Sequence, residues 1–236
     1  MDCRLYQKSM RRLSFLFVAI LLSVASHAQT LQQWRDSLTV LNRLISNDPA
    51  STDLRLRKAA VNIELSQWEY AVEEYGRVLE LDAKNLSALY FRAYAYNQLR
   101  QYDMARADYE HFLSIMPRHF DAQLGLAMTK RNLGRKTETS DDLNRLVEMF
   151  PDSALAYAAR AGFEQEQEQY DAALYDWEEA IRLQPQRLEF QVSRYSVLWA
   201  LKRYDEARRL ADMLVKQGVP LSALERLQPP ARKRRR

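Results

Sequence analysis

The feature that most constrains the fold is a period of 34 residues, which small side chains and prolines follow through most of the chain. One series of small residues consists of Ala59, Ala93, Ala127 and Ala161. A second consists of Ala71, Ala105, Thr139, Ala173 and Ala207, and a third of Pro49, Ala83, Pro117, Pro151 and Pro185. A repeated pair of antiparallel helices needs a small residue where the two backbones approach, and a proline ends the second helix. The period therefore predicts an all-α protein built from helix pairs.

The turn between the two helices of a pair carries a second signal. An aromatic residue followed by an acid recurs at Trp68-Glu69, Tyr102-Asp103, Tyr170-Asp171 and Tyr204-Asp205. We expect the aromatic ring to pack between helices and the acid to lie at the positively polarised N-terminus of the second helix. Glycine is scarce, with 5 residues, and strand-like runs rich in Val, Ile and Thr are absent.

These series resemble the tetratricopeptide repeat family over residues 52–218, and the best match is residues 86–119. The resemblance implies a right-handed α-solenoid of about five helix-turn-helix repeats. The repeats are expected at 52–85, 86–119, 120–153, 154–187 and 188–218. Residues 29–49 align with the second helix of a repeat and are expected to cap the N-terminal end. Residues 219–228 are expected to form a C-terminal capping helix.

The first 28 residues have the pattern of a secretory signal peptide. A basic start precedes an apolar run from Leu13 to Ala25, and the small residues Ser26 and Ala28 precede a cleavage site before Gln29. The run is shorter than the ~20 residues of a spanning helix, which favours cleavage over an uncleaved membrane anchor. We therefore expect an exported protein of a bacterial type, either periplasmic or envelope-associated, or secreted.

The basic residues that set the net charge lie at the two ends of the chain. Four of the 35 basic and one of the 31 acidic residues fall in the first 28 positions, and the last five residues are all basic: Arg232, Lys233, Arg234, Arg235 and Arg236. The region between holds 26 basic and 30 acidic residues, which argues against nucleic-acid binding by the repeats. Residues 229–236 are expected to be a disordered basic tail, which could bind a membrane surface.

The sequence contains no recognisable catalytic or metal-binding set. His111 and His119 lie on either side of Pro117, so they cannot share a helical face, and no third ligand is in register with them. The single cysteine, Cys3, is lost with the signal peptide. Glycine-rich phosphate loops and nucleophile elbows are absent. We therefore expect no enzymatic activity, no cofactor, no metal and no small-molecule substrate.

The remaining candidate site is the concave face that the resemblance implies, lined by the first helix of each repeat. By register this face predicts a partner-binding groove formed by Leu56, Tyr90, Tyr94, Asn97, Leu124, Met128, Arg131 and Trp199. Its apolar and aromatic first half is typical of a surface that receives an amphipathic helix or an extended apolar segment. Packing of the same side chains against neighbouring helices is the alternative. The carboxylate clamp of chaperone-binding members is not expected, because Leu, Ala, Tyr, Leu and Met occupy the matching positions.

The sequence thus favours an exported scaffold or adaptor that binds a protein or peptide partner in this groove. The alternative is an anionic-surface binder that uses the basic tail to dock on lipid headgroups or nucleic acid. Within the array, Ala105 is expected at a tight helix contact, and Lys130 is expected on the exposed side of the third repeat.

Overall fold

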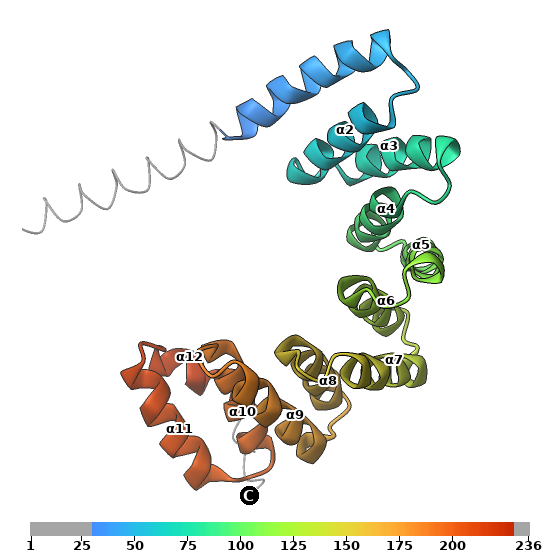
Figure 1. Ribbon diagram of the computed structural model, residues 1–236. Coiled ribbons are helices and arrows are strands. Elements are labelled where there is room, and N and C mark those ends of the chain that lie inside the picture. Colours follow the sequence, from blue (N-terminus) through green and yellow to red (C-terminus); the bar gives the residue numbers. More distant parts are fainter. Residues whose placement is uncertain (1–29, 229–236) are drawn as a thin grey trace, which may run out of the picture. The chain divides into compact units, whose positions relative to one another are not determined.

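In the computed structural model, residues 30–228 are described, and they form helices joined by short turns without a β-strand in that range (Figure 1). The first helix spans residues 30–47. The others are α2 (Thr52–Glu64), α3 (Trp68–Leu81), α4 (Leu86–Gln98), α5 (Tyr102–Ile115), α6 (Phe120–Asn132), α7 (Lys136–Met149), α8 (Ala154–Glu166), α9 (Tyr170–Leu183), α10 (Leu188–Ala200), α11 (Tyr204–Lys216) and α12 (Leu221–Glu225). The predicted all-α fold is confirmed. The predicted signal peptide and basic tail lie outside the described residues.

Each repeat is a pair of helices, from α2 with α3 to α10 with α11, and each pair falls within one of the ranges expected from the sequence. The small residues lie where the backbones approach. Every member of the series that begins with Ala59 and of the series that begins with Ala71 is fully buried, with 0% of its surface exposed. Thr139 replaces alanine in the third repeat, and its hydroxyl donates to the carbonyl of Arg135 at 2.9 Å. This bond satisfies the buried hydroxyl, so threonine fits where alanine is otherwise used.

The chain divides into two compact units within α5, the first ending at Phe112 and the second beginning at Leu113. The core of the first unit contains Ala59, Ala71, Tyr75, Val78, Ala88 and Ala95. The second unit has a cluster around Leu143, Leu146 and Phe163, and a larger one around Trp177, Tyr195 and Leu198. Each repeat therefore buries its apolar side chains against its neighbours within a unit, as expected for a repeat array.

The turns inside the repeats share one backbone conformation. The second residue after the first helix has a positive φ in every repeat: Ser66 at 55°, Arg100 at 58°, Gly134 at 74°, Glu168 at 61° and Lys202 at 62°. A residue in this left-handed region lets the last carbonyls of the helix find N–H partners while the chain reverses. Four of the five are not glycine, although only glycine adopts the conformation without strain.

The helix α12 covers the last repeat in the second unit. Its Leu224 is completely buried, and it contacts both α10 and α11. Just beyond α12, the Gln228 side-chain amide donates to the Tyr195 hydroxyl at 3.0 Å. The apolar end of the final helix pair is thus closed by residues of the same chain.

Candidate functional site

The first helix of four of the five repeats begins at a capping side chain that recurs with the same period. Ser51, Asn85, His119 and Ser153 each accept a hydrogen bond from the backbone N–H three residues later, at 3.4, 3.0, 3.2 and 3.3 Å. Arg187 occupies the position in the fifth repeat and makes no such bond. These caps fix where each first helix starts, and so they fix which of its side chains share a face.

The first-helix face consists of the eight side chains predicted for the groove: Leu56, Tyr90, Tyr94, Asn97, Leu124, Met128, Arg131 and Trp199. The structure leaves all of them at least partly accessible. Tyr94 and Arg131 are exposed, and the other six are half-buried. Four belong to the first unit and four to the second. Their role in binding stays a prediction.

In the first unit, the face combines exposed and packed aromatic rings. Tyr94 is 38% exposed, and its ring meets the Trp68 ring edge-on, with centroids 6.0 Å apart. Tyr90 packs against the rings of Tyr109 and Phe112, both at 5.9 Å. Burial raises the pKa of Tyr109, so its hydroxyl stays neutral. Tyr90 therefore contributes to the core as well as to the face, whereas Tyr94 offers its ring to solvent.

The other two members in the first unit also have packing roles. Leu56 contacts the apolar core of this unit. The Asn97 side chain is hydrogen-bonded to the Tyr109 side chain, which joins α4 to α5. These residues thus pack against a neighbouring helix and keep part of their surface accessible.

In the second unit, the face is less aromatic. Leu124 and Met128 pack against the cluster that contains Leu143 and Leu146. Arg131 forms an ion pair with Glu166 of the next repeat's first helix at 3.4 Å, and both side chains are more than a third exposed. Such exposed pairs contribute little to stability, so this pair is available for a partner's charges.

Trp199 lies at the C-terminal end of the face. Its ring packs between Tyr195 and Tyr204, with centroids at 6.3 and 4.9 Å. The indole Nε1 is buried without a hydrogen-bond partner. Trp199 is therefore mainly a packing residue between α10 and α11.

A series of buried ion pairs inside the repeats was missed by the sequence reasoning. Four second helices place a carboxylate at the same position: Glu74, Asp108, Asp142 and Asp176, which are between 1% and 9% exposed. A base on the first helix of the same repeat meets each one: Lys58 at 2.7 Å, Arg92 at 2.7 Å, Lys130 at 2.7 Å and Arg160 at 2.6 Å. Arg55 also reaches Glu74, at 2.9 Å. The 34-residue spacing of the acids was visible in the sequence and could have revealed the series.

The third and fifth repeats vary this arrangement. In the third, Leu126 stands where the other repeats have a base, and Lys130, one turn later, reaches Asp142 instead. The expectation that Lys130 lies on the exposed side is wrong, because only 12% of its side chain is accessible. In the fifth, Leu210 replaces the acid, and Arg194 pairs with the more exposed Glu178 of the preceding repeat at 2.9 Å.

A second carboxylate lies beside the pair in the fourth repeat. Glu164 lies one turn from Arg160, with an Nε–Oε1 distance of 4.0 Å, and its Oε2 is buried without a hydrogen-bond partner. Burial, together with the nearby charge of Asp176, raises the pKa of Glu164 to about 7. Two carboxylates thus share one guanidinium, and one of them is protonated at mildly acidic pH.

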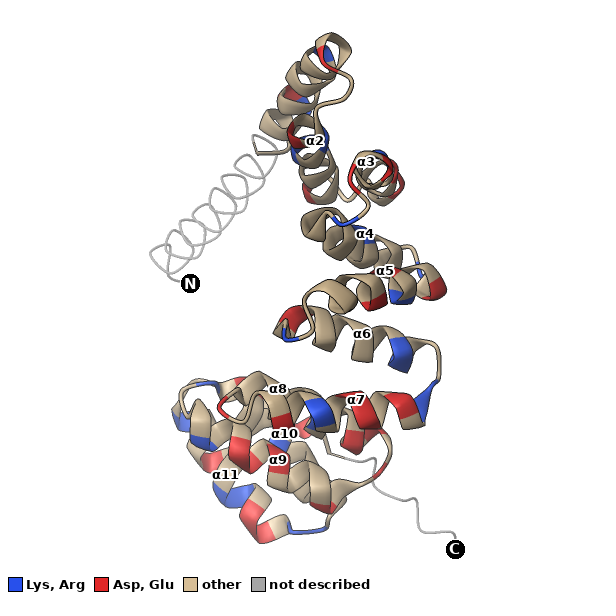
Figure 2. Cartoon of the chain, turned by 45° about the vertical axis from the view of Figure 1, so that its right-hand side comes forward, with Lys and Arg blue, Asp and Glu red and all other residues tan. Residues whose placement is uncertain are grey.

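The remaining surface adds no further chemical site within residues 30–228. No group of three His, Cys, Asp or Glu side chains in this range could hold a metal ion. No helix in the same range is long and apolar enough to cross a membrane. Figure 2 shows blue and red segments distributed along the helices of both units, in agreement with the balanced charge of the repeats. Residues Arg232 to Arg236 lie outside the described range.

Comparison with known proteins identifies the family. Three sequence models of the tetratricopeptide repeat match the chain, over residues 86–119, 121–153 and 164–223. The chain belongs to the tetratricopeptide repeat family. Among its relatives, DnaJ protein P58IPK homolog A of Oryza sativa subsp. japonica is 30% identical over 130 residues. The match covers 54% of this chain and 26% of that protein, so the chain spans about a quarter of the length of such relatives.

Solved tetratricopeptide repeat structures share the fold. A tetratricopeptide repeat protein from Parabacteroides merdae aligns with a TM-score of 0.62 and 21% identity, covering 83% of this chain and 76% of that one. YrrB, described as a tetratricopeptide repeat protein with an unusual peptide-binding site, aligns with a TM-score of 0.58 and 16% identity, covering 79% and 97%. At these identities the similarity establishes the fold of the array.

Proposed function

We propose that this protein is an exported tetratricopeptide repeat scaffold that binds a protein or peptide segment on its first-helix face. The proposal rests mainly on the exposed ring of Tyr94. Its ring is solvent-accessible on a first helix and meets the Trp68 ring edge-on, while Tyr90 on the same helix packs against Tyr109. A rigid aromatic side chain that is partly exposed and fixed by its neighbours is typical of an anchor for a partner.

Other observations favour binding over catalysis. The face lacks a nucleophile paired with a base. The arginines and carboxylates with perturbed pKa values lie in ion pairs, some buried between helices and some exposed within one helix, and the perturbed tyrosines lie in the core. The similarity to YrrB, whose description names a peptide-binding site, supports a peptide or a protein segment as the ligand class. Each apolar anchor fully buried in such a complex would contribute roughly 1.5–3 kcal/mol before ordering costs.

The experiment that tests the proposal places charges on the face. Replacing Tyr94 and Met128 together with glutamate should abolish capture of the partner from an envelope fraction, because a buried carboxylate opposes an apolar ligand. The melting temperature should stay within a few degrees of the parent, since both side chains are at least partly accessible. Early melting or aggregation of the double variant would instead show that these side chains are core residues.

A matched control uses exposed aromatics on the second helices. Tyr70 on α3 and Tyr175 on α9 are 62% and 60% exposed and lie off the first-helix face. The variant Tyr70→Glu with Tyr175→Glu adds the same number of charges, one in each unit. It should leave capture intact. Equal loss of capture in both double variants would show that net charge, and not the first-helix face, controls binding.

Export is a separate part of the proposal. The mature protein is expected to begin at Gln29, because small residues precede it at the positions that signal peptidase reads. Intact mass of the protein accumulated by cells decides this point. A product that keeps the first 28 residues and fractionates with membranes would favour an anchored protein in place of an exported one.

The second candidate function, docking on an anionic surface, rests on the five consecutive basic residues Arg232 to Arg236. Binding of this kind weakens steeply as salt rises, whereas binding to an apolar face does not. Deleting the five residues provides the matching test. If the deletion alone removes binding and the variant of Tyr94 and Met128 binds normally, the scaffold proposal fails and the tail is the functional site.

A further inference from the structure

The helix over residues 30–47 corresponds to the second helix of a repeat. Trp34 stands 34 residues before Trp68, at the turn position where four repeats carry an aromatic residue. Leu41 stands at the position of Tyr75 and is buried like it. In each full repeat, the first helix packs against the second helix and covers one of its faces.

Two apolar side chains of the helix over residues 30–47 are exposed, unlike their equivalents in the full repeats. Val40 is 47% exposed, but its equivalents in the five full repeats are at most 9% exposed: Glu74, Asp108, Asp142, Asp176 and Leu210. Leu44 is 39% exposed, but its equivalents are at most 4% exposed: Val78, Phe112, Leu146, Ala180 and Leu214. A position that is buried in every full repeat and exposed only here indicates a surface that a further element covers.

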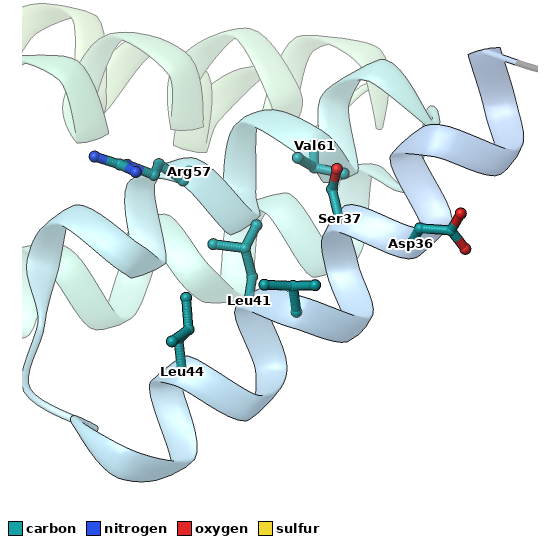
Figure 3. A pocket seen from close by; sticks show the side chains of 7 residues that line it. Asp36, Ser37, Leu41, Leu44, Arg57 and Val61 are labelled. Carbon is teal, nitrogen blue, oxygen red and sulfur yellow. The ribbon is translucent and has the colours of Figure 1, made fainter.

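The exposed face around Val40 and Leu44, called here the open face, contains a pocket with an acidic and a basic side chain at its edge. A pocket of about 490 Å³ has apolar walls formed by Val40, Leu41 and Leu44 of this helix and Val61 of α2. Figure 3 shows Asp36 on the right and Arg57 on the upper left of this pocket, with Leu41 between them and Leu44 below Arg57. Asp36 accepts a hydrogen bond from Gln32 at 2.9 Å, and Arg57 pairs with Asp53 at 3.0 Å. Both contacts are on the exposed surface and can be shared with a partner.

We propose that the open face of the helix over residues 30–47 binds the same face of a second copy of this chain. In a two-fold arrangement, Val40 and Leu44 of one copy pack on those of the other. The two open faces then run in opposite directions, so Asp36 of each copy meets Arg57 of the other. A face with an acid at one end, a base at the other and apolar residues between is complementary to itself in this way.

The C-terminal end of the array favours this closed pairing over a chain of stacked copies. Head-to-tail stacking would require an open end after the last repeat, and α12 covers that end with the fully buried Leu224. Val40 occupies the position of the acid that four full repeats pair with a first-helix base. This face therefore presents an apolar side chain to whatever covers it, as Leu210 does in the fifth repeat. The expected assembly is therefore a dimer that does not extend to filaments.

The first test measures the mass of the protein in solution. The protein is purified in the form that cells accumulate, its N-terminus is read by intact mass, and sedimentation equilibrium is recorded from about 1 to about 100 µM, the range in which small interfaces associate. A reversible monomer–dimer equilibrium is expected. Leu44→Glu should weaken it by about tenfold or more, because two carboxylates then meet at the apolar centre. Met104→Glu, at a 50% exposed methionine on α5, is the control and should leave it unchanged.

The second test exploits the symmetry. Asp36→Arg and Arg57→Glu should each abolish dimerisation, because like charges then meet at both ends of the interface. Mixing the two single variants should restore a dimer, since each charge then faces its opposite across the interface. A monomeric parent at all concentrations, or a dimer that survives Leu44→Glu, would overturn the proposal. It would also be overturned if the purified protein keeps residues before Gln29, is monomeric, and melts early when Leu44 is replaced, because those residues would then cover the face.

Discussion

Removing Arg160 from its buried ion pair should destabilise the protein strongly. Its Nε and Nη2 donate to the two carboxylate oxygens of Asp176 at 2.6 and 2.8 Å, and its Nη1 donates to Asn144 at 3.1 Å. The Asp176 side chain is 1% exposed and the Arg160 side chain 20%. Arg160→Leu leaves Asp176 buried beside Glu164 without a base. An uncompensated buried charge of this kind costs about 3–5 kcal/mol.

Removing both charges should be much less costly. At pH 6, where the raised pKa of about 7 keeps the nearby Glu164 mostly protonated, the variant Arg160→Leu with Asp176→Leu buries no unpaired charge. Such replacements by apolar residues are often close to neutral. Leucine already occurs at both positions elsewhere in the chain. Leu126 is the equivalent of Arg160 in the third repeat, and Leu210 is the equivalent of Asp176 in the fifth. We expect the double variant to lie within about 1.5 kcal/mol of the parent.

Urea denaturation followed by far-UV circular dichroism measures these differences in the free energy of unfolding. In thermal melts, Arg160→Leu should lower the melting temperature by roughly 6–20 °C, given about 2–4 °C per kcal/mol for a chain of this size. The control is Arg194→Leu. Its partner Glu178 is 48% exposed, so the loss should stay below about 1 kcal/mol. The reasoning is refuted if Arg160→Leu costs less than about 1 kcal/mol or if the double variant is as unstable as the single one.

Three further predictions follow from burial and charge. Ala105→Leu should cost roughly 1–3 kcal/mol in urea denaturation, because the fully buried alanine leaves no room between the helices; a neutral result would mean that the pair can separate. Lys130→Ala should cost roughly 1–3 kcal/mol in the same assay, because it leaves the buried Asp142 with Arg145 at 3.4 Å as its remaining base; a change within about 0.5 kcal/mol would contradict this role. The raised pKa of Glu164, about 7 in the folded state against 4.5, means that stability is highest below the lower value and falls as pH rises through 7. Glu164→Gln should therefore match the parent near pH 4.5 and exceed it by roughly 2–3 kcal/mol above pH 8, and equal stability at both pH values would exclude the raised pKa.

The helix pairs could be predicted from the sequence because few residue types are sterically allowed at the positions that repeat every 34 residues. Alanine at a backbone contact and proline after a helix are direct consequences of sterics, so Ala59 and its equivalents report the architecture reliably. The buried ion pairs were missed for the opposite reason. Acids and bases are usually solvated, and Asp108 or Arg92 taken singly is indistinguishable from a surface charge. Only the 34-residue spacing that these acids share distinguishes them from surface charges, and it is not visible when each residue is considered alone.

The candidate face was predicted only in part for a related reason. Register determines which side of a helix a residue occupies, and it placed Tyr94 on an accessible side. Register does not determine how far the adjacent helix reaches across that side. Tyr90 and Asn97 share the face with Tyr94 but are engaged by Tyr109 of α5, and Trp199 is enclosed by Tyr195 and Tyr204. How exposed a side chain of this face is depends on the side chains of the adjacent helix. The pattern of a single helix does not contain that information.

The pairing of each buried acid with a base of its own repeat bears on how such genes change length. A recombination event that duplicates or deletes one whole repeat carries both members of the pair with it, as for Arg92 with Asp108. The new junction then strands no charge in the protein interior. Ion pairs that cross a repeat boundary, such as Arg131 with Glu166 and Arg194 with Glu178, are partly exposed and would be lost at little cost. The array can therefore lengthen or shorten by whole repeats across generations without first passing through an electrostatically unstable intermediate.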